Sequence, residues 1–302
     1  MVRWIKIFSE FVKLPIALSA TLTTAVGFVL ARGNISWELI FPCLSLFLLA
    51  CGSCGLNQYQ ERVIDRFMER TRGRPIPSGR MSPSTGLFCS LGMILLGLTL
   101  FLCKTPSASL FLALFACFWY NGFYTYLKKK TALASVPGAI VGMIPPAIGW
   151  ISGGGSFLDA GLWGLAVFFF VWQVPHFWLF VLYHADDYEK VGLPSLKRVF
   201  SVDQVRHIIS IWMLATACVC FCMPLFFLVH LFPVHLLLIM ATFWLLQGTY
   251  FVLKSEHQGG SFKIAFRRLN LYALWVLLLL SADTIANSKL GAVSGVLAMG
   301  WG

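Results

Sequence analysis

The sequence predicts an all-α integral membrane protein, a bundle of about nine transmembrane helices with an active-site cavity that faces the cytoplasm. Composition is the first observation, because 58% of the 302 residues are hydrophobic and only 12% are charged, against roughly 25% charge in an average soluble domain. The second is that apolar runs long enough to cross a membrane, about 20 residues, recur along the chain. The third is that most charges lie between those runs. Residues 1–302 are therefore predicted to form one membrane domain.

The predicted spans follow one another with short connections. An amphipathic start, residues 4–12, precedes them and is expected to lie at the membrane interface. Pro145 and Pro146 fall inside the fifth span and Pro175 inside the sixth, and prolines deep in a membrane helix bend it and make room for cavities. The nine predicted spans are residues 14–32, 37–57, 86–104, 107–127, 132–152, 159–183, 206–230, 232–253 and 266–287.

Basic residues are distributed unevenly between the two sides of this predicted bundle. With the N-terminus inside, 20 of the 23 Lys and Arg residues fall on inner segments, which is the pattern of the positive-inside rule. The net charge of +11 therefore indicates membrane orientation and does not favour nucleic-acid binding. We expect the N-terminus and the polar loops at the cytoplasmic side.

A dense polar segment begins where the second span ends. Four oxygen-bearing side chains are spaced four residues apart, so a helix that continues through them places their ligand atoms on one face. Four arginines follow, and a divalent metal beside several guanidinium groups is what a diphosphate needs to bind and to leave. The acidic stripe consists of Asn57, Glu61, Asp65 and Glu69, and the arginines are Arg66, Arg70, Arg72 and Arg74.

A second acidic segment occurs in the third predicted inner loop, at Asp186, Asp187 and Glu189. A solvated acidic turn is the simpler interpretation. However, this loop and the stripe together hold six of the twelve acidic residues of the chain, and both lie on the same predicted side. The loop can therefore supply a second set of metal ligands.

Two further features lie in or beside the spans. Tyr124 and Lys128 belong to an aromatic and basic loop, which is either an interfacial belt with topology-setting lysines or part of a phosphate site. His176 is an ionisable side chain well inside the sixth span, where such groups are rare and usually face a cavity or a partner. A hydrogen-bonded structural histidine is the alternative for His176.

These motifs, in this order, resemble the intramembrane aromatic prenyltransferase superfamily of UbiA type, and within it the protohaem IX farnesyltransferases, or haem O synthases. The resemblance runs along most of the chain. The second Asp-x-x-x-Asp element of the wider superfamily is absent from this chain. Ser195 stands where the haem branch usually has Met. The matching segments are Asn57-x-x-x-Glu61-x-x-x-Asp65, continued by Met68, Arg70, Thr71, Arg74 and Pro75, then Tyr124-Thr125 with Leu127-Lys128, Pro145-Pro146 with Gly149-Trp150, Pro175-His176-Phe177-Trp178, and Asp186-Asp187-Tyr188 with Gly192 and Pro194.

The resemblance implies transfer of a farnesyl group from farnesyl diphosphate to a vinyl group of protohaem IX, with addition of water. It implies a multi-pass protein of a bacterial cytoplasmic (inner) membrane, surrounded by lipid, with a haem A synthase or a cytochrome oxidase assembly factor as a possible partner. His176 is expected to bind haem about 15 Å along the helix from Asp186. The implied Mg²⁺ ligands and catalytic residues are Asn57, Glu61, Asp65, Asp186 and Asp187, and the implied diphosphate ligands are Arg70, Arg74, Tyr124 and Lys128.

Two other functions are compatible with parts of the sequence. A prenyltransferase that acts on a quinone-precursor aromatic ring would use the same diphosphate site. A secondary transporter also has many spans and an intramembrane histidine, but it places its polar site near the middle of the bilayer. Here the acidic groups gather at one predicted surface, which favours the prenyltransferase.

Overall fold

The computed structural model describes residues 2–254 and 258–299, and this part of the chain contains helices and connections but no strand. Nine of its helical segments are long and apolar enough to cross a membrane. The helices are α1 (Val2–Phe11), α2 (Leu14–Arg32), α3 (Ile40–Asp65), α4 (Pro83–Lys104), α5 (Ser107–Cys117), α6 (Thr125–Leu127), α7 (Ser135–Gly138), α8 (Ile140–Ser152), α9 (Ala160–Tyr183), α10 (Ala185–Lys190), α11 (Leu196–Val199), α12 (Val202–Cys222), α13 (Phe232–Lys254) and α14 (Gln258–Met299).

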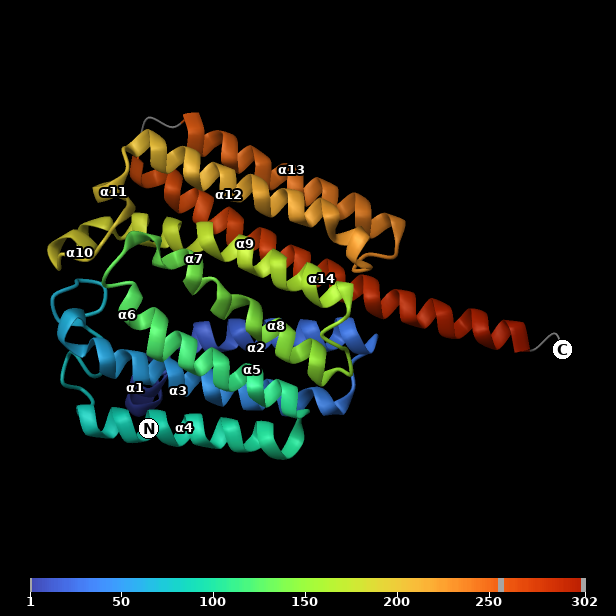
Figure 1. The fold of residues 1–302 in the computed structure, drawn as a ribbon, viewed down its shortest axis with the longest axis horizontal. Coiled ribbons are helices and arrows are strands. Elements are labelled where there is room, and N and C mark those ends of the chain that lie inside the picture. The colour runs from blue at the N-terminus through green and yellow to red at the C-terminus, as the bar shows by residue number, and fades with distance from the viewer. Residues whose placement is uncertain (1, 255–257, 300–302) are drawn as a thin grey trace.

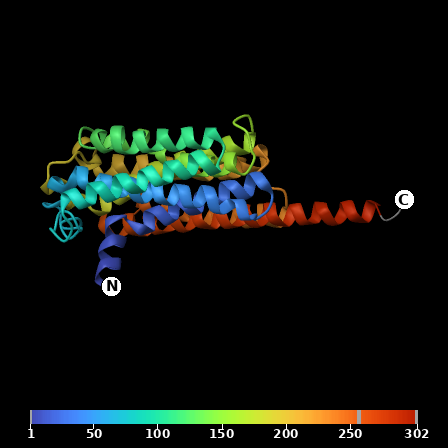
Figure 2. The same ribbon diagram turned by 90° about the horizontal axis from the view of Figure 1, so that it is seen from below.

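The spans lie side by side along the long axis of the molecule (Figure 1). Helix α14 extends past the others at one end, and the short helices α10 and α11 lie at the opposite end. Figure 2 shows α1 running across the bundle direction, and its Trp4, Ile5 and Phe8 are exposed while Phe11 is buried. This arrangement agrees with the predicted interfacial helix.

The predicted spans are confirmed, with changes at their limits. The second span covers Trp37–Asp65, so its helix continues through the acidic stripe as far as Asp65. The fourth contains a π-helix, Phe118–Tyr124, which the sequence pattern did not predict. The fifth is divided near Pro137 into α7 and α8, whereas Pro145 and Pro146 lie inside the continuous helix α8. The ninth covers Phe262–Gly291.

Small residues allow α2 and α8 to approach closely. A Cβ added to Gly27 would lie 2.0 Å from the Pro146 carbonyl oxygen, and one added to Gly149 would lie 1.9 Å from the Thr24 carbonyl oxygen. The Thr24 hydroxyl donates a hydrogen bond to the Pro145 carbonyl at 2.9 Å. Close contact of backbones through small residues is a usual way to join helices inside a membrane, where the hydrophobic effect does not drive their association.

The main apolar core joins α9 with α12, α13 and α14. Phe168 of α9, Met213 of α12, Leu245 of α13 and Leu280 of α14 are all fully buried within it. Tyr272 of α14 is also buried in this core, where its hydroxyl lies 3.0 Å from that of Thr242. Phe180 of α9 brings this half of the bundle next to Arg70, in the loop that follows α3.

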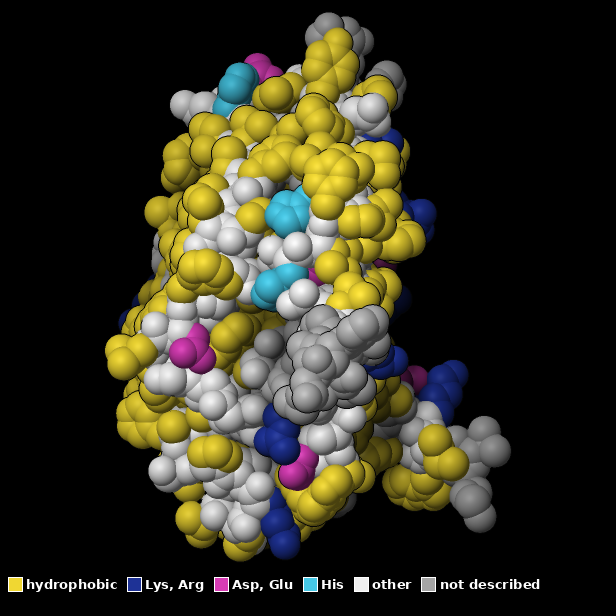
Figure 3. All heavy atoms as spheres, turned by 90° about the vertical axis from the view of Figure 1, so that its right-hand side faces the viewer, with side chains coloured by type: hydrophobic (Ala, Val, Ile, Leu, Met, Phe, Trp, Pro, Cys, Tyr) yellow, Lys and Arg dark blue, Asp and Glu magenta, His cyan; other side chains and the backbone are white. Residues whose placement is uncertain are grey.

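The two ends of the bundle differ in character. The loop of residues 66–82, α10 and α11 gather at the left of Figure 1, and we call this the loop end. Figure 3 looks at the opposite end, where hydrophobic side chains cover much of the visible surface and Lys and Arg are few. The polar site described below lies at the loop end.

Candidate active site

The acidic stripe begins the site, on the last turns of α3. Asn57, Glu61 and Asp65 are 1%, 9% and 3% exposed, and their spacing of four places them on one face of the helix. The expectation for Glu69 was wrong. The helix ends at Asp65, where the Thr71 hydroxyl donates to the Asp65 carbonyl at 2.9 Å, so the chain turns away before it reaches Glu69.

Each member of the remaining stripe faces a cation from another part of the chain. The Lys128 ammonium lies 2.8 Å from the Glu61 carboxylate, and the Arg74 guanidinium lies 2.7 Å from the Asp65 carboxylate. The Asn57 amide oxygen accepts a hydrogen bond from Lys13 at 2.6 Å. Alternating positive and negative groups in a partly buried site strengthen one another electrostatically.

Lys13 is a site residue that the sequence pattern did not single out. It stands directly before α2 with φ 50° and ψ 54°, a left-handed conformation that is costly for a side chain with a Cβ. Burial lowers the pKa of Lys13 to about 8, and the nearby cations Arg74 and Lys128 add to this effect. The sequence did show a basic residue next to the first span. The positive-inside rule already accounts for such a residue, so its position alone did not indicate a role in the site.

Asp187 lies at the same end of the bundle as Asp65, because it joins α10 to the loop that follows α3. Its carboxylate accepts the backbone N–H groups of Glu69 at 3.1 Å and Arg70 at 3.0 Å. Burial alone would raise the pKa of Asp187, but these two hydrogen bonds lower it below its usual range. Asp187 therefore holds the arginine loop in place. The side chain of Asp186 lies outside the described part of the structure.

Arg70 is the cation of the site with unused hydrogen-bonding capacity. Its Nε atom is buried and has no hydrogen-bond partner in the described structure, and its guanidinium lies 5.0 Å from the centre of the Phe180 ring. Burial, with Arg74 nearby, lowers the pKa of Arg70, so its positive charge is poorly solvated. A buried donor without a partner costs about 1–3 kcal/mol, and an anionic ligand would satisfy it.

Tyr124 and Lys128 come from the end of the fourth span. The Tyr124 ring stacks on Phe177 with centroids 5.8 Å apart, and Lys128 Nζ lies 5.7 Å from the Tyr124 centroid. Thr125 fastens this segment to the stripe, because its hydroxyl accepts from the Asn57 amide at 3.1 Å and donates to the Tyr120 carbonyl at 2.8 Å. The π-helix thus places Thr125 beside α3, and π-helical turns are often found at functional sites.

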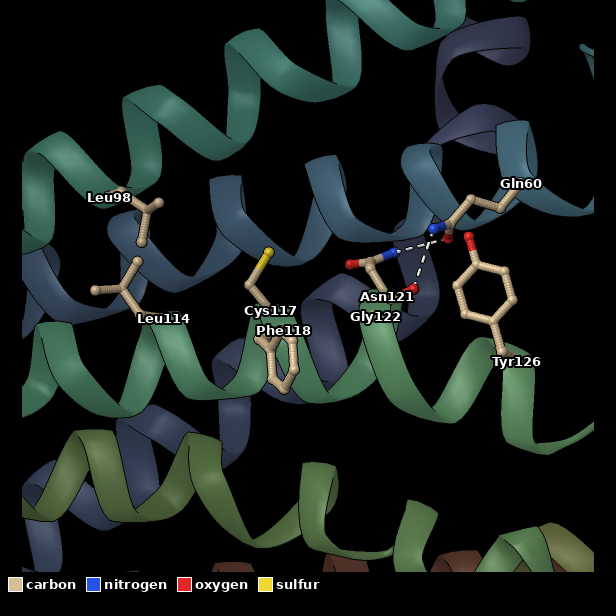
Figure 4. A pocket seen from close by; sticks show the side chains of 8 residues that line it. All are labelled: Gln60, Leu98, Leu114, Cys117, Phe118, Asn121, Gly122 and Tyr126. Atoms are coloured by element: carbon tan, nitrogen blue, oxygen red, sulfur yellow. Dashed lines mark hydrogen bonds between the residues drawn. The ribbon is translucent and has the colours of Figure 1, made fainter.

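Beside the π-helix lies an open groove of about 420 Å³ between α3, α4 and α5 (Figure 4). Gln60 and Asn121 are paired in it: the Gln60 amide donates to the Asn121 carbonyl at 3.0 Å, and the Asn121 amide nitrogen lies 3.4 Å from the Gln60 side-chain oxygen. None of the stripe residues lines this groove. This polar pair joins the π-helix to α3 about one turn before Thr125, on the same face of the fourth span.

His176 lies on α9, in the wall next to these groups. Its Nδ1 atom is 2.8 Å from the Asn270 side-chain oxygen on α14. Its ring lies 5.7 Å from Phe177, whose own ring contacts Tyr124. His176 therefore has a hydrogen-bonded partner, as the structural interpretation expected, and also lies close to the aromatic lining of the site.

The oxygen atoms of the stripe fit a hard divalent cation by their chemistry, because carboxylate and amide oxygens are the ligands that Mg²⁺ prefers. In the described part of the chain, no three His, Cys, Asp or Glu side chains are grouped closely enough to form a metal site by themselves. A bound Mg²⁺ would thus take most of its other ligands from water and substrate phosphate, as this ion usually does.

Three comparisons place this arrangement among known proteins. The UbiA prenyltransferase family matches residues 20–274. A protoheme IX farnesyltransferase from Geobacter sulfurreducens is 41% identical over 179 residues, which are 59% of this chain and 66% of that protein. Another, from Oleidesulfovibrio alaskensis, is 29% identical over 93% of this chain and 97% of its own. The structure of a UbiA homolog from Archaeoglobus fulgidus bound to DMAPP and Mg²⁺ has a TM-score of 0.68 at 14% identity, covering 92% of this chain and 99% of that chain, and shares its fold.

Proposed function

The chain belongs to the UbiA prenyltransferase family, and on this basis we propose that it transfers a farnesyl group from farnesyl diphosphate to a vinyl group of protohaem IX. Water adds to the product, which is haem O, and diphosphate is released. The acceptor is inferred from the relatives named protoheme IX farnesyltransferase. The same names disfavour a quinone-precursor ring as the acceptor.

The observation that carries the proposal is the gathering of cations around a buried acidic stripe. Lys13, Arg74 and Lys128 each contact one stripe residue, and Arg70 adds a buried guanidinium with an unused donor. This charge pattern suits a diphosphate with its metal. A transporter site near the middle of the bilayer would not require it.

Asn57, Glu61 and Asp65 would hold Mg²⁺, with Asp186 as a further candidate ligand, and the ion would supply positive charge to the leaving diphosphate. Arg70, Arg74, Lys128 and Lys13 would bind the phosphate oxygens. Their charges stabilise the developing negative charge as the leaving group departs. Asp187 was also expected to bind the metal, but each of its carboxylate oxygens accepts a backbone N–H group. We propose instead that it acts on the site by fixing the backbone of Arg70.

In the reaction, the bond between farnesyl C1 and the diphosphate oxygen breaks, and both electrons leave with the diphosphate. The π electrons of the haem vinyl group form a new carbon–carbon bond to C1, which leaves a cation on the vinyl carbon attached to the porphyrin. Water adds there through its oxygen and loses a proton, giving a hydroxyl group. The faces of Tyr124, Phe177 and Phe180 would stabilise the cationic carbons, and the membrane bundle limits early capture by water.

The protein is a multi-pass membrane protein. We place it in a bacterial inner membrane with the loop end towards the cytoplasm. The bacterial relatives and the distribution of basic residues support this location and orientation. Farnesyl would extend from the loop end between the helices, away from the charged site.

A turnover assay with purified protein, haem and labelled farnesyl diphosphate tests the function. We expect Mg²⁺-dependent formation of haem O, and loss of about 100-fold or more in rate for Asp65→Asn, because the neutral amide weakens charge stabilisation at the site. Asp203→Asn is the matched control, because Asp203 is 79% exposed and pairs with Arg206 outside the site. Label found in 4-hydroxybenzoate but not in haem would contradict the proposed acceptor.

A further inference from the structure

The contact between His176 and Asn270 joins two helices through a polar pair in an apolar region. His176 lies seven residues before the end of α9, about 10 Å along the helix from the loop end. Trp172, one turn earlier, donates from its indole nitrogen to the Leu269 carbonyl at 3.0 Å. Two neighbouring hydrogen bonds thus fasten α9 to α14 and limit the movement of the imidazole.

The orientation of the Asn270 amide follows from its second contact. Its nitrogen donates to the Phe266 carbonyl at 2.8 Å, and a carbonyl can only accept a hydrogen bond. The amide oxygen must therefore be the atom that faces His176 Nδ1 at 2.8 Å. A flipped amide would place its oxygen against the Phe266 carbonyl and lose that hydrogen bond.

This orientation selects one form of the histidine. Because the Asn270 oxygen is an acceptor, Nδ1 must carry the proton, and in a neutral imidazole the other nitrogen, Nε2, then has a free lone pair. In the described part of the chain no side chain donates a hydrogen bond to Nε2, and His176 as a residue is partly exposed. A histidine that binds a metal through one ring nitrogen usually donates a hydrogen bond from the N–H of the other ring nitrogen to a neighbouring acceptor. The Asn270 oxygen is such an acceptor.

Aromatic rings line the route from His176 to the diphosphate site. One series runs through Phe177 to Tyr124, with centroid distances of 5.7 Å and 5.8 Å, and reaches Lys128. A second runs through Phe266 to Phe180, at 5.0 Å and 6.1 Å, and reaches Arg70. Aromatic rings thus continue from His176 towards both cations, and such a lining suits a flat aromatic macrocycle.

We propose that Asn270 is a positioning residue for the haem substrate. It keeps His176 in the Nδ1–H form and fixes the direction of Nε2, which binds the haem iron. The inference rests on the proposed function, because it takes haem as the acceptor. It assigns to Asn270 a role in acceptor binding, whereas the diphosphate is held by the loop end.

The test is haem binding and its spectroscopy in purified protein. Ferrous haem in the wild type should show an iron–histidine stretching band that is absent in His176→Ala. Asn270→Leu, which has no acceptor, should weaken haem binding by about ten- to a hundredfold. Asn270→Asp should restore binding and raise the stretching frequency, because a carboxylate makes the imidazole a stronger donor to iron. A purely structural role for Asn270 would not move this frequency.

His207→Ala is the control, because His207 is exposed on α12 and bonds to the carbonyl of Asp203. It should leave the band and the affinity unchanged. Two outcomes overturn the inference: a band that persists in His176→Ala, or a frequency that is the same in wild type and Asn270→Asp. If wild type also converts haem to haem O in those experiments, the proposed function still stands. Failure of wild type to make haem O under any condition would instead reject the function.

Discussion

Lys13 combines two unfavourable features at one residue. Its left-handed backbone, φ 50°, costs on the order of 1–3 kcal/mol at such positions, and its ammonium lies in a buried region close to Arg74 and Lys128. The contact with Asn57 at 2.6 Å does not by itself require this geometry. Under the proposed function, a diphosphate that binds beside Asn57 would compensate this cluster of positive charges.

Raising the pH should therefore weaken binding of farnesyl diphosphate. The pKa of Lys13 is about 8, below its usual 10.5, because of burial and the neighbouring cations, while Glu61 and Cys54 act in the opposite direction. Only the protonated form attracts the diphosphate, so KM should rise about tenfold from pH 7 to pH 9. Lys13→Arg keeps its charge over this range and should flatten the profile, as steady-state kinetics would show.

The expected rise of KM with pH cannot come from a loss of stability caused by deprotonation of Lys13. Because the folded pKa lies below the unfolded value, the unfolded chain binds more protons between about pH 8 and 10.5, and the contribution of Lys13 to stability rises with pH in that window. A KM for Lys13→Arg that follows the same pH dependence as wild type would assign the titration to another group.

At the scale of a helix, the π-helix Phe118–Tyr124 determines how the fourth span meets the stripe. Thr125 follows it directly and hydrogen-bonds to both Asn57 and the Tyr120 carbonyl. Replacing Thr125 by Val keeps the shape and removes the hydroxyl, so a buried amide and a carbonyl lose their partner. We expect kcat/KM to fall about tenfold, which corresponds to one hydrogen bond.

Thr99→Val is the matched change for that experiment. The Thr99 hydroxyl bonds only to the Leu95 carbonyl of its own helix at 2.9 Å, on an exposed part of α4. Its kcat/KM should remain that of wild type. Equal losses in both variants would show that the hydroxyl of Thr125 has no special connection to the site.

The contact between α2 and α8 should be intolerant of added volume. In Gly149→Ala the new methyl group would lie 1.9 Å from the Thr24 carbonyl oxygen, so the helices must separate, at a cost of about 1–3 kcal/mol. A lowered Tm in detergent would report this. Gly92→Ala is the control, since no heavy atom lies within 4 Å of the added Cβ and alanine favours the helix. A Tm for Gly149→Ala equal to that of Gly92→Ala would contradict the packing account.

The spans could be predicted because each needs about 20 apolar residues in a row, a property of local sequence. The stripe at Asn57, Glu61 and Asp65 could also be predicted, since a spacing of four defines one helix face. Lys13 and Asn270 could not be found in this way. Their partners, Asn57 and His176, lie 44 and 94 residues away, and only the packing of helices brings each pair together.

At the scale of the whole molecule, the loop end carries the stripe and its cations, while hydrophobic side chains cover much of the other end (Figure 3). An enzyme that receives a charged diphosphate must present this end to the compartment that contains it. Basic loops are retained on the cytoplasmic side during insertion. The same distribution of charge would thus orient the bundle and supply the cations around the stripe.

This orientation can be measured on intact cells with a maleimide that does not cross membranes. In a variant whose nine cysteines are replaced by alanine, single cysteines are placed at Arg72, in the exposed arginine loop, and at Asn34, in the exposed turn between α2 and α3. We expect Asn34→Cys to be labelled from outside, and Arg72→Cys only after the cells are permeabilised. The reverse pattern would place the diphosphate site outside the cell and separate it from cytoplasmic farnesyl diphosphate. Because the two positions lie at opposite ends of the same bundle, each serves as the internal control for the other.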